Sequence, residues 1–212
     1  MQKTHIQQTV SEPLQLALDA TLINLLDQLN WTAKADITQF DIAKLDASWP
    51  ALSGAATVDA EGDLSTATVA GKLKGKYPEL GPLNADFNVQ RLSNNTIQIN
   101  RLQLLAPESN TTLNAEGSWQ VGKTAGETGA NNGGNIKLVL NWQNLRWPAH
   151  DTPWFNSANG SGTIEGNIDS YQLTLDSDSP CPQAAPSTWH ASATGNMDGL
   201  KIQNPRINAL NG

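Results

Sequence analysis

The sequence has little of what most catalytic and metal sites are built from. Its 212 residues include one cysteine and three histidines. Cys181 has no partner for an intrachain disulfide, no Cys cluster exists to hold a metal, and its setting between two prolines indicates a loop thiol. A nucleophilic cysteine needs a nearby base. With only His5, His150 and His190 as histidines, we expect no enzymatic activity, no catalytic residue, no metal and no cofactor.

Positive charge and long apolar runs are also scarce. Thirteen Lys and Arg residues against twenty Asp and Glu give a formal net charge of −7, so there is no basic footprint for nucleic acid. No stretch approaches the ~20 apolar residues of a membrane helix, and residues 1–10 lack the apolar core of a signal peptide. The chain begins and ends in mid-pattern, so we expect an internal fragment of a longer protein.

The chain is instead rich in Asn, Gln, Ser, Thr, Gly and Ala and in two-residue alternation, a composition typical of secreted or periplasmic β-proteins. Leu83, Ala85, Phe87 and Val89 alternate with polar residues, which predicts a strand with one apolar face. Similar patterns recur along the chain, and they predict an all-β protein of about ten to fourteen strands.

Two features interrupt the alternation. Ile97 and Ile99 lie at odd positions, whereas Leu102 and Leu104 lie at even positions. This shift in the alternation predicts a β-bulge at Asn100–Arg101. The leucines within Thr21–Leu29 follow i, i+3, i+4, i+7 spacing, which predicts the one short helix.

The sequence also shows a weak duplication with a period of roughly a hundred residues. Trp49-Pro50 recurs as Trp147-Pro148, and Gly54–Val58 recurs as Gly160–Ile164. We therefore expect a first β repeat over residues 1–121, a Gly- and Asn-rich flexible loop over 122–135 and a second repeat over 136–212. In repeat proteins each unit covers the open end of its neighbour, so we expect one continuous structural unit.

Polar clusters offer little chemistry. Asp59, Glu61 and Asp63 surround one predicted hairpin tip, and hard cations take oxygen ligands. The spacing matches no calcium motif, so solvated turn carboxylates are the favoured interpretation. Trp49, Trp147 and Trp154 fall at related places in the repeats. Exposed aromatic rings bind sugars, whereas buried ones seal the ends of sheets, and the second role is favoured.

The apolar strand faces allow two architectures. A sandwich or barrel buries such faces against each other, whereas an open sheet folded on itself leaves an apolar trough. An exposed apolar surface of a few hundred Å² generally marks a binding site. Strand parity alone is compatible with both.

Dispersed segments along nearly the whole chain resemble a known family. They are Leu29–Trp31, Phe40–Leu45, Ser48–Pro50, Gly71–Gly75, Leu83–Val89, Ile99–Leu102, Leu113–Trp119 and Leu140–Pro148. These segments are similar to the repeat region of the TamB family, the periplasmic translocation and assembly subunit. The resemblance implies a β-taco, a long open sheet folded lengthwise with an aliphatic interior. It also implies a periplasmic location, an inner-membrane anchor and an Omp85-class outer-membrane barrel as partner, the last two through regions outside this chain.

The function that the resemblance implies is binding of phospholipid acyl chains for transport between the inner and outer membranes, support of outer-membrane protein assembly, or both. The residues that we expect to line the groove are Leu83, Phe87, Val89, Ile97, Ile99, Leu102, Leu104, Leu138 and Leu140. An adhesin or carbohydrate-binding sandwich that uses the tryptophans is the alternative.

Overall fold

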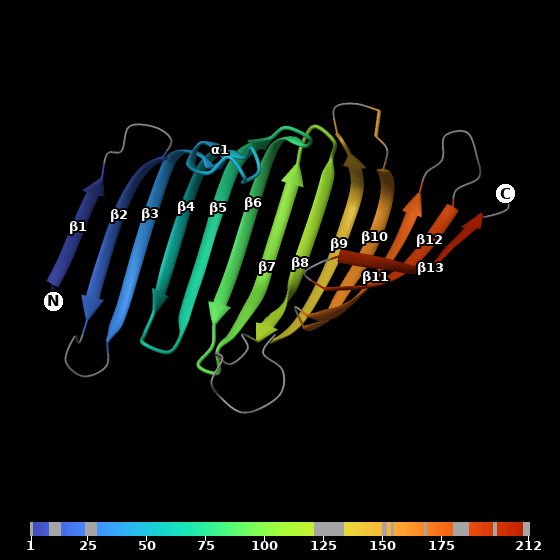
Figure 1. Ribbon diagram of the computed structural model, residues 1–212. Coiled ribbons are helices and arrows are strands. Elements are labelled where there is room, and N and C mark those ends of the chain that lie inside the picture. The colour runs from blue at the N-terminus through green and yellow to red at the C-terminus, as the bar shows by residue number, and fades with distance from the viewer. Residues whose placement is uncertain are drawn as a thin grey trace.

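The protein is a single long antiparallel β-sheet in its computed structural model (Figure 1). The structure describes residues 2–8, 14–23, 29–120, 134–149, 152–153, 155–167, 169–179, 187–196 and 199–209. Thirteen strands lie in the sheet in their order along the chain, and each pairs antiparallel with the next. Sequential hairpins of this kind need only short connections, which is why a chain of repeated strand and turn signals adopts this topology.

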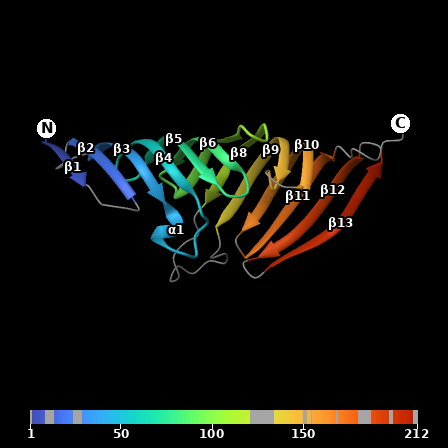
Figure 2. The ribbon, with the colours of Figure 1, turned by 90° about the horizontal axis from the view of Figure 1, so that it is seen from above.

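The strands are β1 (Gln2–Gln8), β2 (Leu14–Ile23), β3 (Asn30–Asp41), β4 (Ser53–Gly62), β5 (Ala67–Tyr77), β6 (Gly81–Arg91), β7 (Thr96–Ala106), β8 (Thr111–Gln120), β9 (Asn135–Trp147), β10 (Phe155–Asn167), β11 (Ser170–Ser179), β12 (Ser187–Asn196) and β13 (Gly199–Ala209). The helix α1 (Ile42–Leu45) is a single turn in the connection from β3 to β4. In the view from above, α1 lies to one side of the row of strands (Figure 2).

The prediction of an all-β, open and elongated sheet is confirmed, and the number of strands falls within the predicted range. All strands that the structure describes belong to the one sheet. No second sheet formed by these residues covers either face, so the closed sandwich and the barrel are excluded for this part of the chain.

The predicted helix was wrong for Thr21–Ile23, which continue strand β2, and residues 24–28 lie outside the described residues. Leu22 is the only leucine within Thr21–Ile23, so its position fits a helical period of 3.6 residues and a strand period of two residues equally well. Leu22 pairs with Trp31 and Ala20 with Ala33, so partner strands supply the backbone hydrogen bonds. A helix of so few residues is marginal by itself, and strand pairing therefore prevails.

The predicted bulge is confirmed. In the β6–β7 pair the register shifts between Asn88 and Val89. In the β7–β8 pair it shifts between Ile99 and Leu102. The predicted loop at 122–135 lies almost wholly outside the described residues, and β9 begins at Asn135. Strands β8 and β9 pair directly on either side of it.

The sequence duplication corresponds to a displacement of six strands. Trp49 lies in the β3–β4 connection and Trp147 at the end of β9, while Gly54 lies in β4 and Gly160 in β10. The duplicated units therefore continue edge to edge within one sheet, because each leaves an edge strand that the next unit can pair with.

Candidate functional site

The pairing register divides the sheet into two faces of opposite character. Residues directly opposite each other in an antiparallel pair project from the same face. Phe87 pairs with Leu102, Leu102 with Ala115, and Ala115 with Leu140. These four residues on four successive strands therefore share one surface, which we call the apolar face.

All nine residues that the sequence predicted for a groove lie on the apolar face. Leu83 pairs with Gly75, and Ile99 pairs with Val89 on one side and Gly117 on the other. Leu138 pairs with Gly117. The remaining six are Phe87 and Val89 in β6, Ile97, Leu102 and Leu104 in β7, and Leu140 in β9.

The apolar face extends beyond the predicted residues in both directions. The same alternation in the flanking strands was the signal that could have found them. Its further members include Leu16 and Leu18 of β2, Ala35 and Ile37 of β3, Ala56 and Val58 of β4, Val69 and Leu73 of β5, Ile164 of β10, Leu173 and Leu175 of β11, and Ala191 and Ala193 of β12. From β2 to β12, Arg91 at the end of β6 is the one charged residue at an apolar-face position among the described residues.

The apolar face is only partly shielded from solvent. Most of its residues are half-buried, because neighbouring side chains cover one another and no second layer of described residues covers them. Leu200 and Ile202 of β13 are 50% and 64% exposed. Exposed apolar surfaces of more than a few hundred Å² generally mark binding sites, so this face is the candidate site.

One margin of the apolar face is bridged. Tyr77 of β5 projects from this face, and its ring centroid lies 6.0 Å from that of Trp147 at the end of β9. Trp147 reaches the same side as Trp142 because the left-handed backbone of Asn144 (φ 50°) interrupts the alternation of β9. Four strand spacings in a flat sheet separate strands by about 19 Å. The amide of Ala149 also donates a hydrogen bond to the carbonyl oxygen of Glu79 over 2.7 Å. The sheet therefore curls towards its apolar face here, and this face is the concave one.

The bridge covers the turn between β7 and β8. Ala106 and Thr111 on either side of that turn are 0% and 1% exposed. The Thr111 hydroxyl donates to the carbonyl oxygen of Asn144 over 2.6 Å. We call this region, formed by 77–80, 106–111 and 147–149, the bridged margin.

Large rings lie flat over glycines on the floor of the concave face. A Cβ atom on Gly160 would lie 2.2 Å from the ring of Trp142, and one on Gly71 would lie 2.6 Å from the ring of Phe87. One on Gly195 would lie 2.5 Å from the ring of Tyr171. Each ring therefore occupies the space that a side chain at the glycine would fill.

The tryptophans that the structure describes have mainly packing contacts. Trp142 is 6% exposed, and its indole NH donates to the Ser157 hydroxyl, which also accepts from Ser177. Trp147 packs on Tyr77. Trp49 is 53% exposed in the β3–β4 connection, and Trp154 lies outside the described residues.

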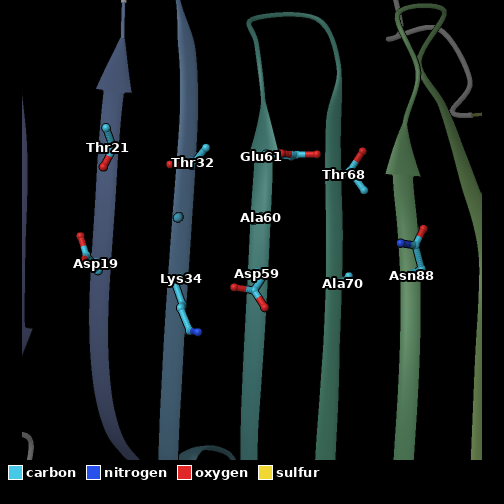
Figure 3. Close-up of a pocket in the computed structure, with 11 residues that line it drawn as sticks. Asp19, Thr21, Thr32, Lys34, Asp59, Ala60, Glu61, Thr68, Ala70 and Asn88 are labelled. Atoms are coloured by element: carbon cyan, nitrogen blue, oxygen red, sulfur yellow. The ribbon is translucent and has the colours of Figure 1, made fainter. Parts of the chain in front are cut away.

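The opposite face is polar and carries a shallow hollow (Figure 3). The hollow measures about 540 Å³, and its lining comes from five adjacent strands, β2 to β6. Asp19, Asp59 and Glu61 line it together with Lys34. Both signs of charge are mixed there, and all four side chains are exposed to water.

The acidic clusters noted in the sequence have structural partners. Both Ser65 and Thr66 donate to Asp63 through their amides and hydroxyls. These bonds, with the Thr66 and Ser65 amides foremost, hold the pKa of Asp63 well below its ordinary value of 3.8. Asp176 lies 2.7 Å from His190 Nδ1 on the polar face. The described part of the chain contains no group of three His, Cys, Asp or Glu side chains arranged to hold a metal.

Comparison with known proteins agrees with this geometry. The family model described as TamB, N-terminal domain, matches residues 3–212. No curated protein and no solved structure matches the chain. Among the described residues, no helix is both long enough and apolar enough to span a membrane.

Proposed function

The chain belongs to the TamB family, and from this premise we propose that its concave apolar face binds lipid acyl chains in the periplasm. The lipids would be phospholipids in transit between the inner and outer membranes. The protein would act without catalysis. The remainder of a full-length protein would provide the inner-membrane anchor and the contact with an Omp85-class barrel.

The observation that carries this proposal is the continuity of the apolar face. Thirteen strands in one sheet, at about 4.8 Å per spacing, give a surface roughly 58 Å long across the strands. One leaflet of hydrocarbon is about 15 Å thick. The surface therefore has the length of a track for several acyl chains rather than that of a pocket for one.

The chemistry of the face also suits transfer. Each CH₂ withdrawn from water contributes about 0.8 kcal/mol, and this gain depends on buried area rather than on direction. A floor with Arg91 as its one charged position from β2 to β12 among the described residues lets a chain move from strand to strand with little change in free energy. Lipid headgroups would remain in water at the open margin.

A second use has its own structural support. Among the described residues, strands β1 and β13 each have one neighbour in the sheet and are its edge strands. Such edges accept an added strand, which would suit a nascent outer-membrane protein. Strand addition would require the edges of the sheet, whereas lipid binding would require the apolar face. Experiments can therefore distinguish the two uses.

Adjacent leucines on opposite faces provide a matched test. Leu104 pairs with Leu113 on the apolar face, whereas Leu105 pairs with Thr112 on the polar face and is 39% exposed. The protein is incubated with phospholipid vesicles, separated from them and weighed intact by native mass spectrometry. We expect Leu104→Asp, and to a smaller degree Leu104→Gln, to lose bound phospholipid, while Leu105→Asp retains it.

Circular dichroism of each variant checks that the sheet is folded. Equal lipid occupancy in folded Leu104→Asp and Leu105→Asp proteins would contradict the proposal. Absence of lipid from the unaltered protein would contradict it as well.

A further inference from the structure

The bridged margin contains an acidic group whose charge the fold leaves incompletely satisfied. Among the described residues, Oε2 of Glu79 is a buried side-chain oxygen without a hydrogen-bond partner. Buried polar atoms almost always have partners, and leaving a charged one without any is strongly unfavourable. Such an unpartnered carboxylate oxygen calls for an explanation, and a bound cationic group would supply the missing donor.

A pair of aromatic rings begins beside this carboxylate, with Tyr77. Tyr77 precedes Glu79 in the β5–β6 turn, which is closed by a hydrogen bond from the Leu80 amide to the Tyr77 carbonyl oxygen. The ring of Trp147 lies against that of Tyr77. Burial raises the pKa of the Tyr77 phenol, and the charge of Glu79 and a hydrogen bond with it raise that pKa further. The phenol and the carboxylate are therefore neighbours.

Nearby cationic side chains project from the other face. Lys76 directly precedes Tyr77, and Arg146 directly precedes Trp147. Because neighbouring residues in a strand project from opposite faces, Lys76 and Arg146 project from the polar face. Both are exposed there. Glu79 forms no ion pair with another described residue.

A carboxylate beside aromatic rings is the combination that recognises an ammonium group. The carboxylate accepts the N–H donors in charge-assisted hydrogen bonds, and the faces of tyrosine and tryptophan attract the cation. Because Tyr77 and Trp147 project from the concave face, a group held there would stand at the margin of the surface where acyl chains are proposed to lie.

We propose that Glu79, Tyr77 and Trp147 form a site for the ammonium headgroup of a zwitterionic phospholipid. This inference rests on the proposed function, because the acyl chains bring the headgroup to the margin. It adds selectivity: the apolar floor accepts any tail, and the bridged margin favours lipids that carry an amine.

The test separates headgroup preference from lipid binding. The protein is offered vesicles of equal parts phosphatidylethanolamine and phosphatidylglycerol with identical acyl chains, and the bound lipids are identified by mass spectrometry. We expect phosphatidylethanolamine to be enriched about tenfold, as one charge-assisted hydrogen bond allows. Glu79→Gln should bind the same total amount of lipid without that enrichment.

The control is Glu116→Gln, since Glu116 is an exposed acid on the polar face of β8. It removes the same charge from a chain of net charge −7 and should leave the enrichment intact. Enrichment that persists in Glu79→Gln, or that disappears equally in Glu116→Gln, would overturn the site. Lipid bound without preference by the unaltered protein would overturn the site and leave the proposed function standing.

A second measurement does not depend on acyl chains. Free ethanolamine is titrated into the protein, and the indole NH resonance of Trp147 is followed by NMR. We expect a saturable shift in the unaltered protein and in Glu116→Gln, and none in Glu79→Gln. This shift in a protein that takes up no phospholipid would support the site and contradict the proposed function. No shift in the unaltered protein would contradict the site.

Discussion

A methyl group at Gly160 tests whether the rings on the concave floor depend on the glycines beneath them. A Cβ at this position would lie 2.2 Å from two atoms of the Trp142 ring and 2.6 Å from the indole nitrogen. Trp142 is nearly fully buried and bonds to Ser157 over 2.7 Å. In Gly160→Ala the ring must leave its place, because no ordinary contact is that short.

The expected loss of stability follows from two contributions. Overpacking of a well-packed site costs about 1–3 kcal/mol, and leaving the partners of a buried hydrogen bond unsatisfied costs about 1–3 kcal/mol. Replacing glycine by alanine returns about 0.4–1 kcal/mol through the unfolded chain. We expect Gly160→Ala to lower the free energy of unfolding by about 2–4 kcal/mol.

The assay is urea unfolding followed by far-UV circular dichroism, with near-UV circular dichroism reporting the packing of the tryptophan. The control is Gly199→Ala, because a Cβ on Gly199 meets no atom within 4 Å; its stability should change by less than about 0.5 kcal/mol. Adding Trp142→Leu to Gly160→Ala should cause less further loss than Trp142→Leu does alone, since the clash is gone. Equal stability and equal near-UV spectra for the two alanine variants would refute the reasoning.

Two further changes test the turn and the bridged margin. The lowered pKa of Asp63 means that its ionised form stabilises the β4–β5 turn at pH values above 3.8, and that this stabilisation is lost as the pH falls below 3.8 towards the lowered value. Carboxyl NMR should therefore show Asp63 titrating well below 3.8, and Asp63→Ala should speed hydrogen exchange at the Ser65 and Thr66 amides; titration at the ordinary value would contradict this. Trp147→Ala removes the ring that packs on Tyr77, so we expect a loss of about 1–3 kcal/mol and a tyrosinate titration shifted back towards the ordinary pKa. An unchanged tyrosine titration would show that Trp147 does not bury Tyr77.

The apolar face could be predicted from the sequence because it depends on a local property. In a strand, alternate residues share a face whatever the strand pairs with. Residues such as Phe87 and Val89 were therefore assigned together correctly, and the parity shift at Asn100–Arg101 predicted the bulge that keeps Ile99 and Leu102 on one face. The strands lie in their order along the chain, since sequential hairpins are the simplest arrangement.

The remaining features depend on contacts distant in the sequence. The spacing of the leucines in Thr21–Leu29 favoured a helix, and only pairing with β3 makes Thr21–Ile23 a strand. Which face is concave depends on Tyr77 meeting Trp147 across four strands, and no local pattern reports such a contact. The hydrogen bond from the Ala149 amide to the Glu79 carbonyl oxygen is equally distant in sequence, so Glu79 was missed.

The most direct test of the account is a map of where acyl chains contact the protein. The protein is loaded with a phospholipid whose acyl chain carries a photoactivatable diazirine, irradiated and digested, and the crosslinked residues are identified by mass spectrometry. Leu102 and Leu138 project from the apolar face, whereas their neighbours Gln103 and Lys137 project from the polar one. The account predicts crosslinks at Leu102, Leu138 and the residues paired with them. Crosslinks at Gln103 and Lys137, or spread equally over both faces, would contradict it.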